Sequence, residues 1–425
     1  MPVKIWIINH FAYLPEDGPH TRHFTMGKYL ARLGYEPTVF AANELHGTGR
    51  TIKTGRDLYA EKHKDNVKFL YVKSHHYEKN DIHRVINIIS CYFNMLKVCR
   101  MEAKRNGPPD VIYASSLYPT ALMVGIKLAK KYKTKCISET RDIVPDGFIT
   151  QGTFKANGII AKTTRFIMRR LYEKSDALVF TMSGGPQYIL DMGWDIPHGG
   201  KIDPKRVYYI NNGVDLEAFE ENARSFVLPD NDLDNENLFK VVYLGAIRFF
   251  NKMSLYLDAA KELKKRGRDD IKILMWGTGT KIEEMRQQLI DQGLDNLVLK
   301  GYVEKKYIPA IAKRADLFIG TGNSSCVDKY GISFNKLFDY MAGSKPIILP
   351  FRVNDSIVAA NGLGVEMNEA DGIKLAEEII RFADMNKSDY KEYCDSAQAI
   401  VSEYSYEALS AKLDHIICGL LNQEN

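Results

Sequence analysis

Cationic and carboxylate side chains cluster in loops that follow apolar, strand-like segments. The stretch "YGISFNKLFDYMAGSKPIILP" (residues 330–350) places Lys336 in the first turn of a predicted helix and Asp339 one turn further along. The helix dipole disfavours a cation in a first turn, so a lysine there is best explained by an anion bound at the helix start. Ser333 is the expected N-cap of this helix. The sequence therefore predicts an anion site at this helix start.

Two loops in the same half of the chain have a similar character. Arg248 and Lys252 come just after Gly245, between the strand-like "VVYLG" and a predicted helix, and both are suited to a phosphate. Gly277 and Gly279 follow "ILMWG" and allow the backbone to come close to a ligand. We expect these loops to contribute to a phosphate site.

The first half of the chain has two more candidate loops. After the first strand, a turn at Gly18 leads into a helix start that is crowded by His20, Arg22 and His23. Backbone amides and cationic side chains at that point favour an anion, and an ordinary basic surface loop is the alternative. Arg141 and Asp142 follow the strand "KCISET", where reactive or substrate-holding groups are common, although a structural ion pair is the alternative.

The elements that position these loops alternate between strand-like and helical patterns. Such alternation predicts an α/β fold of two doubly wound, parallel-sheet (Rossmann-like) domains. The expected bounds are residues 1–216 and 238–402, joined by a polar linker at 217–237. A C-terminal helix is expected at about 403–425, and it could pack back on the first domain. Ligands of such sheets bind beyond the carboxyl ends of the strands, which is where the candidate loops lie.

Composition and charge narrow the class of protein. The 425 residues are 45% apolar and 26% charged, as in globular proteins, without a run of apolar residues long enough to span a membrane. The six cysteines show no C-x-x-C spacing and the N-terminus has no cleavage site, so a cytoplasmic protein without a disulfide framework is expected. No G-x-G-x-x-G, H-E-x-x-H, G-x-S-x-G or P-loop motif occurs, which argues against NAD and against a catalytic metal.

The two halves of the chain differ in charge. Residues 1–212 contain 32 Lys and Arg against 19 Asp and Glu, whereas residues 213–425 contain 26 against 34. A basic first half suggests an anionic partner there, and solvated surface charge is the alternative. Nucleic acid is not expected as a partner.

Several segments, in order along the chain, carry a resemblance to a known family. They are "VYYINNGVDLEAF", "YLGAIRFFNKM", "MWGTGTKIEEM", "LVLKGYVEKKYIPAIAKRADLFI" and "KLFDYMAGSKPII", together with the glycine loop before "YLARLGYEPTVF". They resemble the retaining nucleotide-sugar glycosyltransferases of family 4, which have the GT-B fold. The resemblance implies that the two domains face each other across a cleft. "SETRDIVPDG" and "NKLFDYMAGSKP" further resemble a bacterial surface-polysaccharide subgroup that includes N-acetylfucosamine-type transferases.

This resemblance implies transfer of a sugar from a nucleotide diphosphate sugar, UDP-linked and with N-acetylated amino sugars among the candidates. The acceptor would be a glycan or a polyprenyl-diphosphate-linked glycan. The implied donor-binding residues are Gly18, Gly245, Gly277, Asp328, Gly331, Ile332, Ser333, Asn335, Lys336, Leu337 and Asp339. The implied catalytic residues are Arg141, Asp142, Arg248 and Lys252, and the acceptor-side residues are His20, Arg22 and His23. Amides and cations would stabilise the leaving diphosphate, so no metal or other cofactor is expected.

The chain departs from the family pattern at three places. Asp339 matches the second of two acidic residues, but Gly331 stands at the first position, and Asp328 fits there only with an insertion. Ala246 replaces an arginine, which leaves Arg248 to serve. The Arg141–Asp142 region replaces a histidine of the first domain.

A lipid-linked acceptor would bring the first domain to the inner membrane leaflet. Residues 84–105 and 159–174 are basic amphipathic candidates for that contact, with core-facing helices as the alternative. Two other functions stay open: a sugar-nucleotide epimerase of the same fold, and a non-catalytic binder of sugar nucleotides or glycans. An epimerase would convert the donor without an acceptor, and a binder would convert nothing.

Overall fold

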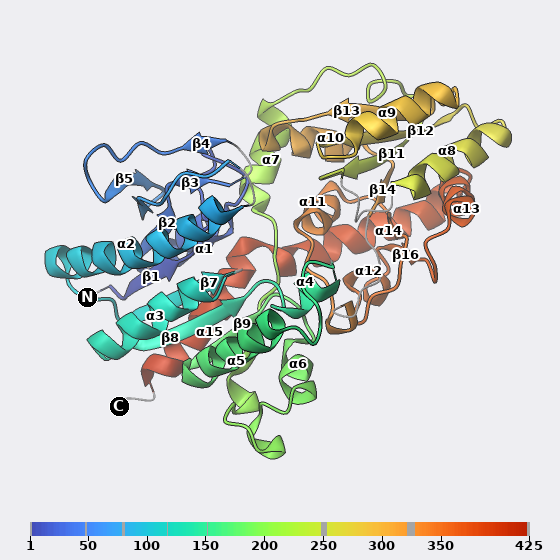
Figure 1. Ribbon diagram of the computed structural model, residues 1–425. Helices are drawn as coiled ribbons and strands as arrows, with labels where there is room; N and C mark the ends of the chain where they lie inside the picture. The colour runs from blue at the N-terminus through green and yellow to red at the C-terminus, as the bar shows by residue number, and fades with distance from the viewer. Residues whose placement is uncertain are drawn as a thin grey trace. The chain divides into compact units, whose positions relative to one another are not determined.

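The computed structural model describes residues 2–46, 49–78, 81–116, 118–150, 152–247, 253–320 and 328–422, without the side chains of residues 116 and 328. The chain divides into two compact units (Figure 1). The first consists of Met1–Asn211 with Tyr406–Asn425, and the second of Asn212–Ser405.

The first unit contains an eight-stranded sheet in the order β10-β9-β8-β7-β1-β2-β6-β5. Its strands are β1 (Lys4–Ile8), β2 (Glu36–Ala42), β5 (Tyr59–Lys64), β6 (Val67–Val72), β7 (Val111–Ser116), β8 (Lys135–Thr140), β9 (Ala177–Phe180) and β10 (Val207–Tyr209). The neighbouring strands are parallel except for β5, which pairs antiparallel with β6 at the edge. Two short strands, β3 (Glu44–Leu45) and β4 (Arg50–Thr51), form a separate hairpin.

Helices cover both faces of this sheet. They are α1 (Arg22–Arg32), α2 (Ile82–Asn106), α3 (Pro119–Tyr132), α4 (Asp146–Thr150), α5 (Ile159–Lys174), α6 (Gly185–Asp191) and α15 (Tyr406–Asn422). The C-terminal helix α15 packs on α1, and its Leu413 and Ile417 are fully buried in the core of this unit. On the other face, α2 contacts α3, and α3 contacts α5.

The second unit contains a six-stranded parallel sheet in the order β13-β12-β11-β14-β15-β16. Its strands are β11 (Phe239–Leu244), β12 (Ile271–Trp276), β13 (Leu297–Gly301), β14 (Leu317–Ile319), β15 (Ile347–Leu349) and β16 (Gly364–Glu366). Its helices are α7 (Leu216–Ser225), α8 (Ser254–Lys265), α9 (Ile282–Asp291), α10 (Ile308–Arg314), α11 (Asn335–Gly343), α12 (Ile357–Ala360), α13 (Gly372–Ala383) and α14 (Lys387–Ile400). The strand order reverses between β11 and β14, and such a switch point is where open α/β sheets bind ligands.

The alternation of side chains along β11 shows why this sheet is buried on both faces. Val241 and Tyr243 belong to the core on one face, whereas Val242 and Leu244 belong to the core on the other. Successive residues of a strand point to opposite faces, so an unbroken apolar run requires helices on both sides. The expected α/β fold with two doubly wound parallel sheets is confirmed.

Residues 217–237 form part of the second unit instead of a free linker. Phe219 of α7 and Leu233 are buried in its core. The ammonium group of Lys300 lies 2.7 Å from a carboxylate oxygen of Asp230 and 2.6 Å from one of Asp232. These contacts fasten the acidic segment to the end of β13.

A substitution at Gly277 tests how closely the ends of β11 and β12 approach. A Cβ at Gly277 would lie 1.8 Å from the carbonyl oxygen of Gly245, and φ is +153°. We expect Gly277→Ala to lower the free energy of unfolding of the second unit by about 2 kcal/mol or more, as overpacking does. Gly419→Ala is the control, because a Cβ on that helical residue meets nothing within 4 Å. Equal stability of the two variants in urea unfolding would contradict this packing.

Candidate functional site

The carboxyl ends of β11 and β12 form a narrow backbone platform. The Gly245 amide donates to the Trp276 carbonyl at 2.9 Å, and the Ile247 amide donates to the Thr278 carbonyl at 3.0 Å. The two segments that follow β11 and β12 thus stay hydrogen-bonded beyond the last strand residues. Glycines are required there, because a Cβ at Gly277 would lie 1.8 Å from the Gly245 carbonyl oxygen and a Cβ at Gly245 would lie 3.1 Å from the Tyr243 hydroxyl.

Lys336 lies over this platform. It is the second residue of α11, and its Nζ lies 4.3 Å from the centre of the Tyr243 ring and donates to the Tyr243 hydroxyl at 3.1 Å. A Cβ on Gly245 would lie 2.9 Å from the same Nζ. The ammonium group therefore lies at the end of β11, beside the switch point. The prediction that Lys336 occupies the first turn of a helix is confirmed.

The start of α11 differs from the sequence prediction in its cap. Phe334 is the N-cap, and no described side chain caps the helix. The Ser333 hydroxyl instead accepts a hydrogen bond from the Asn212 amide at 2.9 Å, and the Ser333 carbonyl accepts one from the Asn212 side chain at 2.6 Å. The prediction of Ser333 as N-cap is wrong, because its hydroxyl fastens the helix start to the beginning of the unit. A helix start without a side-chain cap is the kind that binds anions.

Asp339, one turn beyond Lys336, is a partly buried carboxyl with an unusual pKa. Burial raises the pKa of Asp339 from 3.8 to about 6, and the charge of Lys305 opposes that shift. Lys305 lies in the loop after β13. This carboxyl is poised to change charge near neutral pH, which suits a group that contacts hydroxyls or exchanges a proton.

The remaining predicted donor residues are placed as follows. Gly331 is buried with φ at +85°, a conformation that a residue with a side chain rarely adopts. Ile332 is half-buried, Leu337 is in the core and Asn335 is exposed. Arg248, Lys252 and the side chain of Asp328 lie outside the described residues.

A buried carboxylate, which the sequence interpretation missed, organises the predicted acceptor side. Glu139 of β8 accepts hydrogen bonds from the Arg22 guanidinium at 2.9 and 2.6 Å. The hydroxyls of Tyr113 and Ser115 also donate to it, and His23 Nε2 lies 3.3 Å from its second oxygen. The signal in the sequence was Glu139 within the strand "KCISET", because a carboxylate that is buried in a central strand requires partners.

The charges of this network are balanced internally. Arg22 keeps a raised pKa although burial opposes it, because Glu139 lies against its guanidinium. Burial acts to raise the pKa of Glu139, yet Arg22 and His23 hold it well below its ordinary value of 4.5. Burial lowers the pKa of His23 to about 4, so this ring is neutral at pH 7. Arg22 and His23 are thus internal groups and not the ligand-facing cations that the sequence suggested.

The other predicted residues of the first unit lie around this network. Arg141, just after β8, has a buried Nε without a hydrogen-bond partner among the described residues, and its charge acts on Glu139 and His23. The Asp142 side chain is exposed. Arg141 therefore lies near the Glu139 network with an Nε–H that could donate a further hydrogen bond.

Two residues of the loop after β1 have local roles. The His20 ring lies 5.3 Å from the Tyr13 ring. The Gly18 amide donates to the Leu14 carbonyl at 3.2 Å, and a Cβ there would lie 2.7 Å from the Tyr13 ring. Gly18 thus belongs to the first unit, whereas the other described donor candidates belong to the second.

The match to a known protein family lies within the second unit. Residues 239–385, which include the Gly245 and Gly277 platform and α11, match the family described as "Glycosyl transferases group 1". No curated protein sequence matches the chain significantly.

Solved structures match both units. Sucrose-phosphate synthase from Thermosynechococcus elongatus has a TM-score of 0.70 at 15% identity, with 99% of this chain and 100% of that one covered. Trehalose 6-phosphate synthase from Burkholderia multivorans has a TM-score of 0.71 at 11% identity, with both chains covered to 100%. HepE from Anabaena, solved in complex with UDP and glucose, has a TM-score of 0.65 at 14% identity, with 98% of this chain and 100% of that one covered. At these identities the likeness shows the fold, which is that of the GT-B glycosyltransferases.

The buried pair of Arg22 and Glu139 predicts a stability effect. Glu139→Gln leaves the Arg22 charge buried without compensation, so we expect a loss of about 3–5 kcal/mol in the free energy of unfolding of the first unit. Adding Arg22→Met to this variant should recover part of the loss, because no uncompensated charge then remains. Additive losses in this double-mutant cycle would contradict the pairing.

The raised pKa of Asp339 predicts a pH dependence of stability. Between pH 4 and 6 the unfolded chain ionises this carboxyl before the folded chain does, so folding stability falls as pH rises through this window. Asp339→Asn removes the effect and should be more stable than the wild type by about 1–2 kcal/mol above pH 6, with part of the side chain exposed to water. Urea unfolding of both proteins from pH 5 to pH 7.5 measures the difference. A difference that does not grow with pH would show that the pKa is not raised.

Proposed function

We propose that this protein is a glycosyltransferase that takes its sugar from a UDP-sugar. The observation that carries the proposal is Lys336, held over the end of β11 at the start of α11. An ammonium group, a helix start and a backbone platform at one switch point together suit a diphosphate. The segment that carries them matches group 1 glycosyl transferases, and HepE, which shares the fold, was solved with UDP.

The proposed chemistry is dominated by the leaving group. As the bond from the anomeric carbon to the diphosphate breaks, negative charge grows on the diphosphate and positive charge on the sugar ring. Lys336 and the first amides of α11 would stabilise the diphosphate without reorganising, which is the largest contribution that such a site can make. Asp339 is proposed to contact hydroxyls of the donor. Transfer with retention of configuration is part of this proposal, as is catalysis without a metal.

The acceptor is proposed to be a glycan, free or linked to a polyprenyl diphosphate, in the synthesis of a bacterial surface polysaccharide. Arg141 and Asp142, at the carboxyl end of β8, are the residues proposed to serve it. Arg141 supports this role, because its Nε has no hydrogen-bond partner among the described residues. An N-acetylated amino sugar is the proposed donor sugar, by the resemblance of "SETRDIVPDG" and "NKLFDYMAGSKP" to such transferases.

Replacing the Lys336 ammonium tests the donor site. Lys336→Met keeps most of the side-chain length and removes one charge-assisted hydrogen bond to the diphosphate, so UDP should bind about 10- to 100-fold more weakly. Isothermal titration with UDP and UDP-sugars measures this change. Lys313→Met is the control, because Lys313 lies on α10 and pairs with Glu220 at 2.8 Å. Equal UDP affinity of the two variants would remove Lys336 from the donor site, and no binding of UDP by the wild type would refute the proposal.

A further inference from the structure

The outward face of α2 carries an apolar stripe. Ile82, Ile86, Ile89 and Phe93 recur at the spacing of one helix face, and each is exposed, Phe93 to 57%. The buried residues of this helix, such as Cys91 and Met95, lie on the opposite face and pack on the sheet. A helix on a globular protein normally turns charged and polar residues outward, so α2 has a second apolar face without a described partner.

Helices α3 and α5 continue this surface. Figure 1 shows α2, α3 and α5 side by side over one face of the first unit's sheet, and α3 contacts both of the others. Ile159 is 84% exposed and Phe166 is 60% exposed on α5, and Met123 is exposed on α3. Of the sixteen large hydrophobic side chains that are exposed among the described residues, ten lie on these three helices. We call this surface the α2–α3–α5 face.

The α2–α3–α5 face is strongly basic. The three helices contain thirteen Lys and Arg residues and only two acidic residues. Glu102 is buried and pairs with Lys68 at 3.0 Å, and Glu173 pairs with Arg169 at 2.9 Å. The acidic groups are therefore neutralised locally, and the surface presents a large excess of positive charge.

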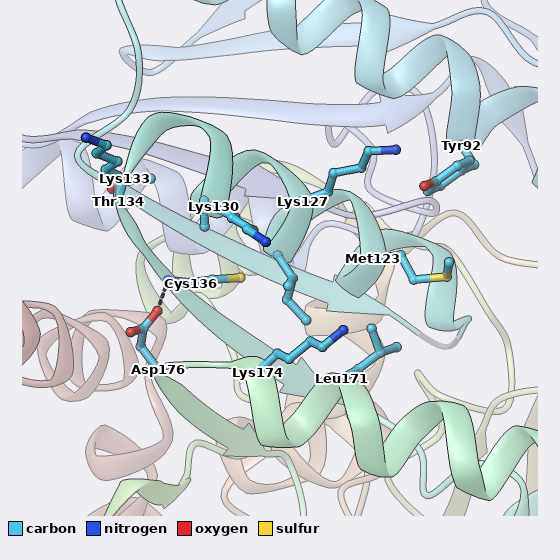
Figure 2. Close-up of a pocket in the computed structure, with 12 residues that line it drawn as sticks. Tyr92, Met123, Lys127, Lys130, Lys133, Thr134, Cys136, Leu171, Lys174 and Asp176 are labelled. Carbon is cyan, nitrogen blue, oxygen red and sulfur yellow. Dashed lines mark hydrogen bonds between the residues drawn. The ribbon is translucent and has the colours of Figure 1, made fainter.

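A groove of about 660 Å³ lies between α3 and α5 on this face. Its lining is apolar at Met123, Ile126 and Leu171, and four exposed lysines border it: Lys127, Lys130, Lys133 and Lys174. Figure 2 shows Lys130 and Lys174 extending from the two helices into the space between them. No hydrogen bond or ion pair joins any of the four ammonium groups to another described residue. The one carboxylate in the lining, Asp176, accepts a hydrogen bond from the Cys136 amide at 2.7 Å.

We propose that the α2–α3–α5 face docks on the surface of an anionic phospholipid bilayer, with lipid phosphates at the four groove lysines. Exposed Ile and Phe side chains enter the boundary between headgroups and acyl chains, while lysines and arginines neutralise the lipid charge. Helices that lie on a membrane have this combination of an apolar stripe and basic residues. None of the helices formed by the described residues is long and apolar enough to cross a membrane, so contact of this kind is peripheral.

Charge complementarity favours the bilayer over a second copy of the chain. Two copies that met through this face symmetrically would bring two basic surfaces together, and like charges oppose that contact. A bilayer with anionic lipids offers the opposite charge and an apolar interior to the same residues. The inference extends the proposed function, because a lipid-linked acceptor would be met at that surface, but vesicle binding requires neither donor nor acceptor.

Co-sedimentation with vesicles tests the docking. We expect the full chain to bind vesicles of equal parts phosphatidylcholine and phosphatidylglycerol, and to be released by high salt, whereas phosphatidylcholine alone binds it weakly. Replacing Lys127, Lys130, Lys133 and Lys174 together by Gln should lower the partition coefficient by about 100- to 1,000-fold, because each basic residue near an anionic surface contributes to binding. Ile89→Ser with Phe93→Ser and Phe166→Ser should also lower it, since these exposed residues provide the apolar contact.

The matched control replaces four exposed lysines of the second unit by Gln: Lys261, Lys265, Lys313 and Lys391. It removes the same charge and should bind vesicles like the wild type. Equal loss in both quadruple variants, equal binding to phosphatidylcholine alone, or no vesicle binding would overturn the proposal. Self-association of the wild type that the three serine substitutions abolish, without vesicle binding, would assign the face to a second copy instead. Titration with UDP is unaffected in the groove variant, so failure of docking is distinguishable from failure of the donor site.

Discussion

The approach of two parallel strand ends sets the geometry of the second unit's site. A Cβ on Gly277 would lie 1.8 Å from the Gly245 carbonyl oxygen, so the backbones approach closely there, and β11 and β12 remain paired past their last residues. Tyr243, two residues before Gly245, contacts the Lys336 ammonium with its ring and accepts a hydrogen bond from it at its hydroxyl. Three elements far apart in the chain thus place one positive charge at the switch point of the sheet.

The charged groups near the strand ends have different surroundings in the two units. In the first unit, Glu139 is enclosed by Arg22, His23 and two hydroxyls, so its charge is balanced within the network at the end of β8. Its surplus of positive charge lies instead on the outer helices α2, α3 and α5. In the second unit, whose overall charge is negative, the Lys336 ammonium lies at the end of β11. Charge at the centre of the first unit supports the fold, and the proposed diphosphate site uses the charge at the switch point of the second.

Much of the fold was predictable because its signals are local. The apolar runs of β1, β11 and β12 and the helical spacing between them indicate parallel sheets wherever they occur, and Lys336 was placed in its first turn by spacing alone. The N-cap of α11 was not predictable, because the Ser333 hydroxyl is used by Asn212, more than a hundred residues away. The burial of Arg22 and His23 was not predictable for the same reason. The local sequence at a helix start is the same whether a basic side chain there faces water or a buried carboxylate.

The alternation of strands and helices, the glycines after β11 and β12, and the separation of basic and acidic halves can all be read from the sequence. These properties depend on side-chain type and spacing, which the chain carries before it folds. Which charges are paired depends on the fold. Arg22 pairs with Glu139, whereas Lys127, Lys130, Lys133 and Lys174 have no hydrogen-bond or ion-pair partner among the described residues. The partners of a buried charge come from distant segments of the chain, and the free-energy cost of the charge depends on its burial. Neither the partner nor the burial can be read from neighbouring residues in the sequence.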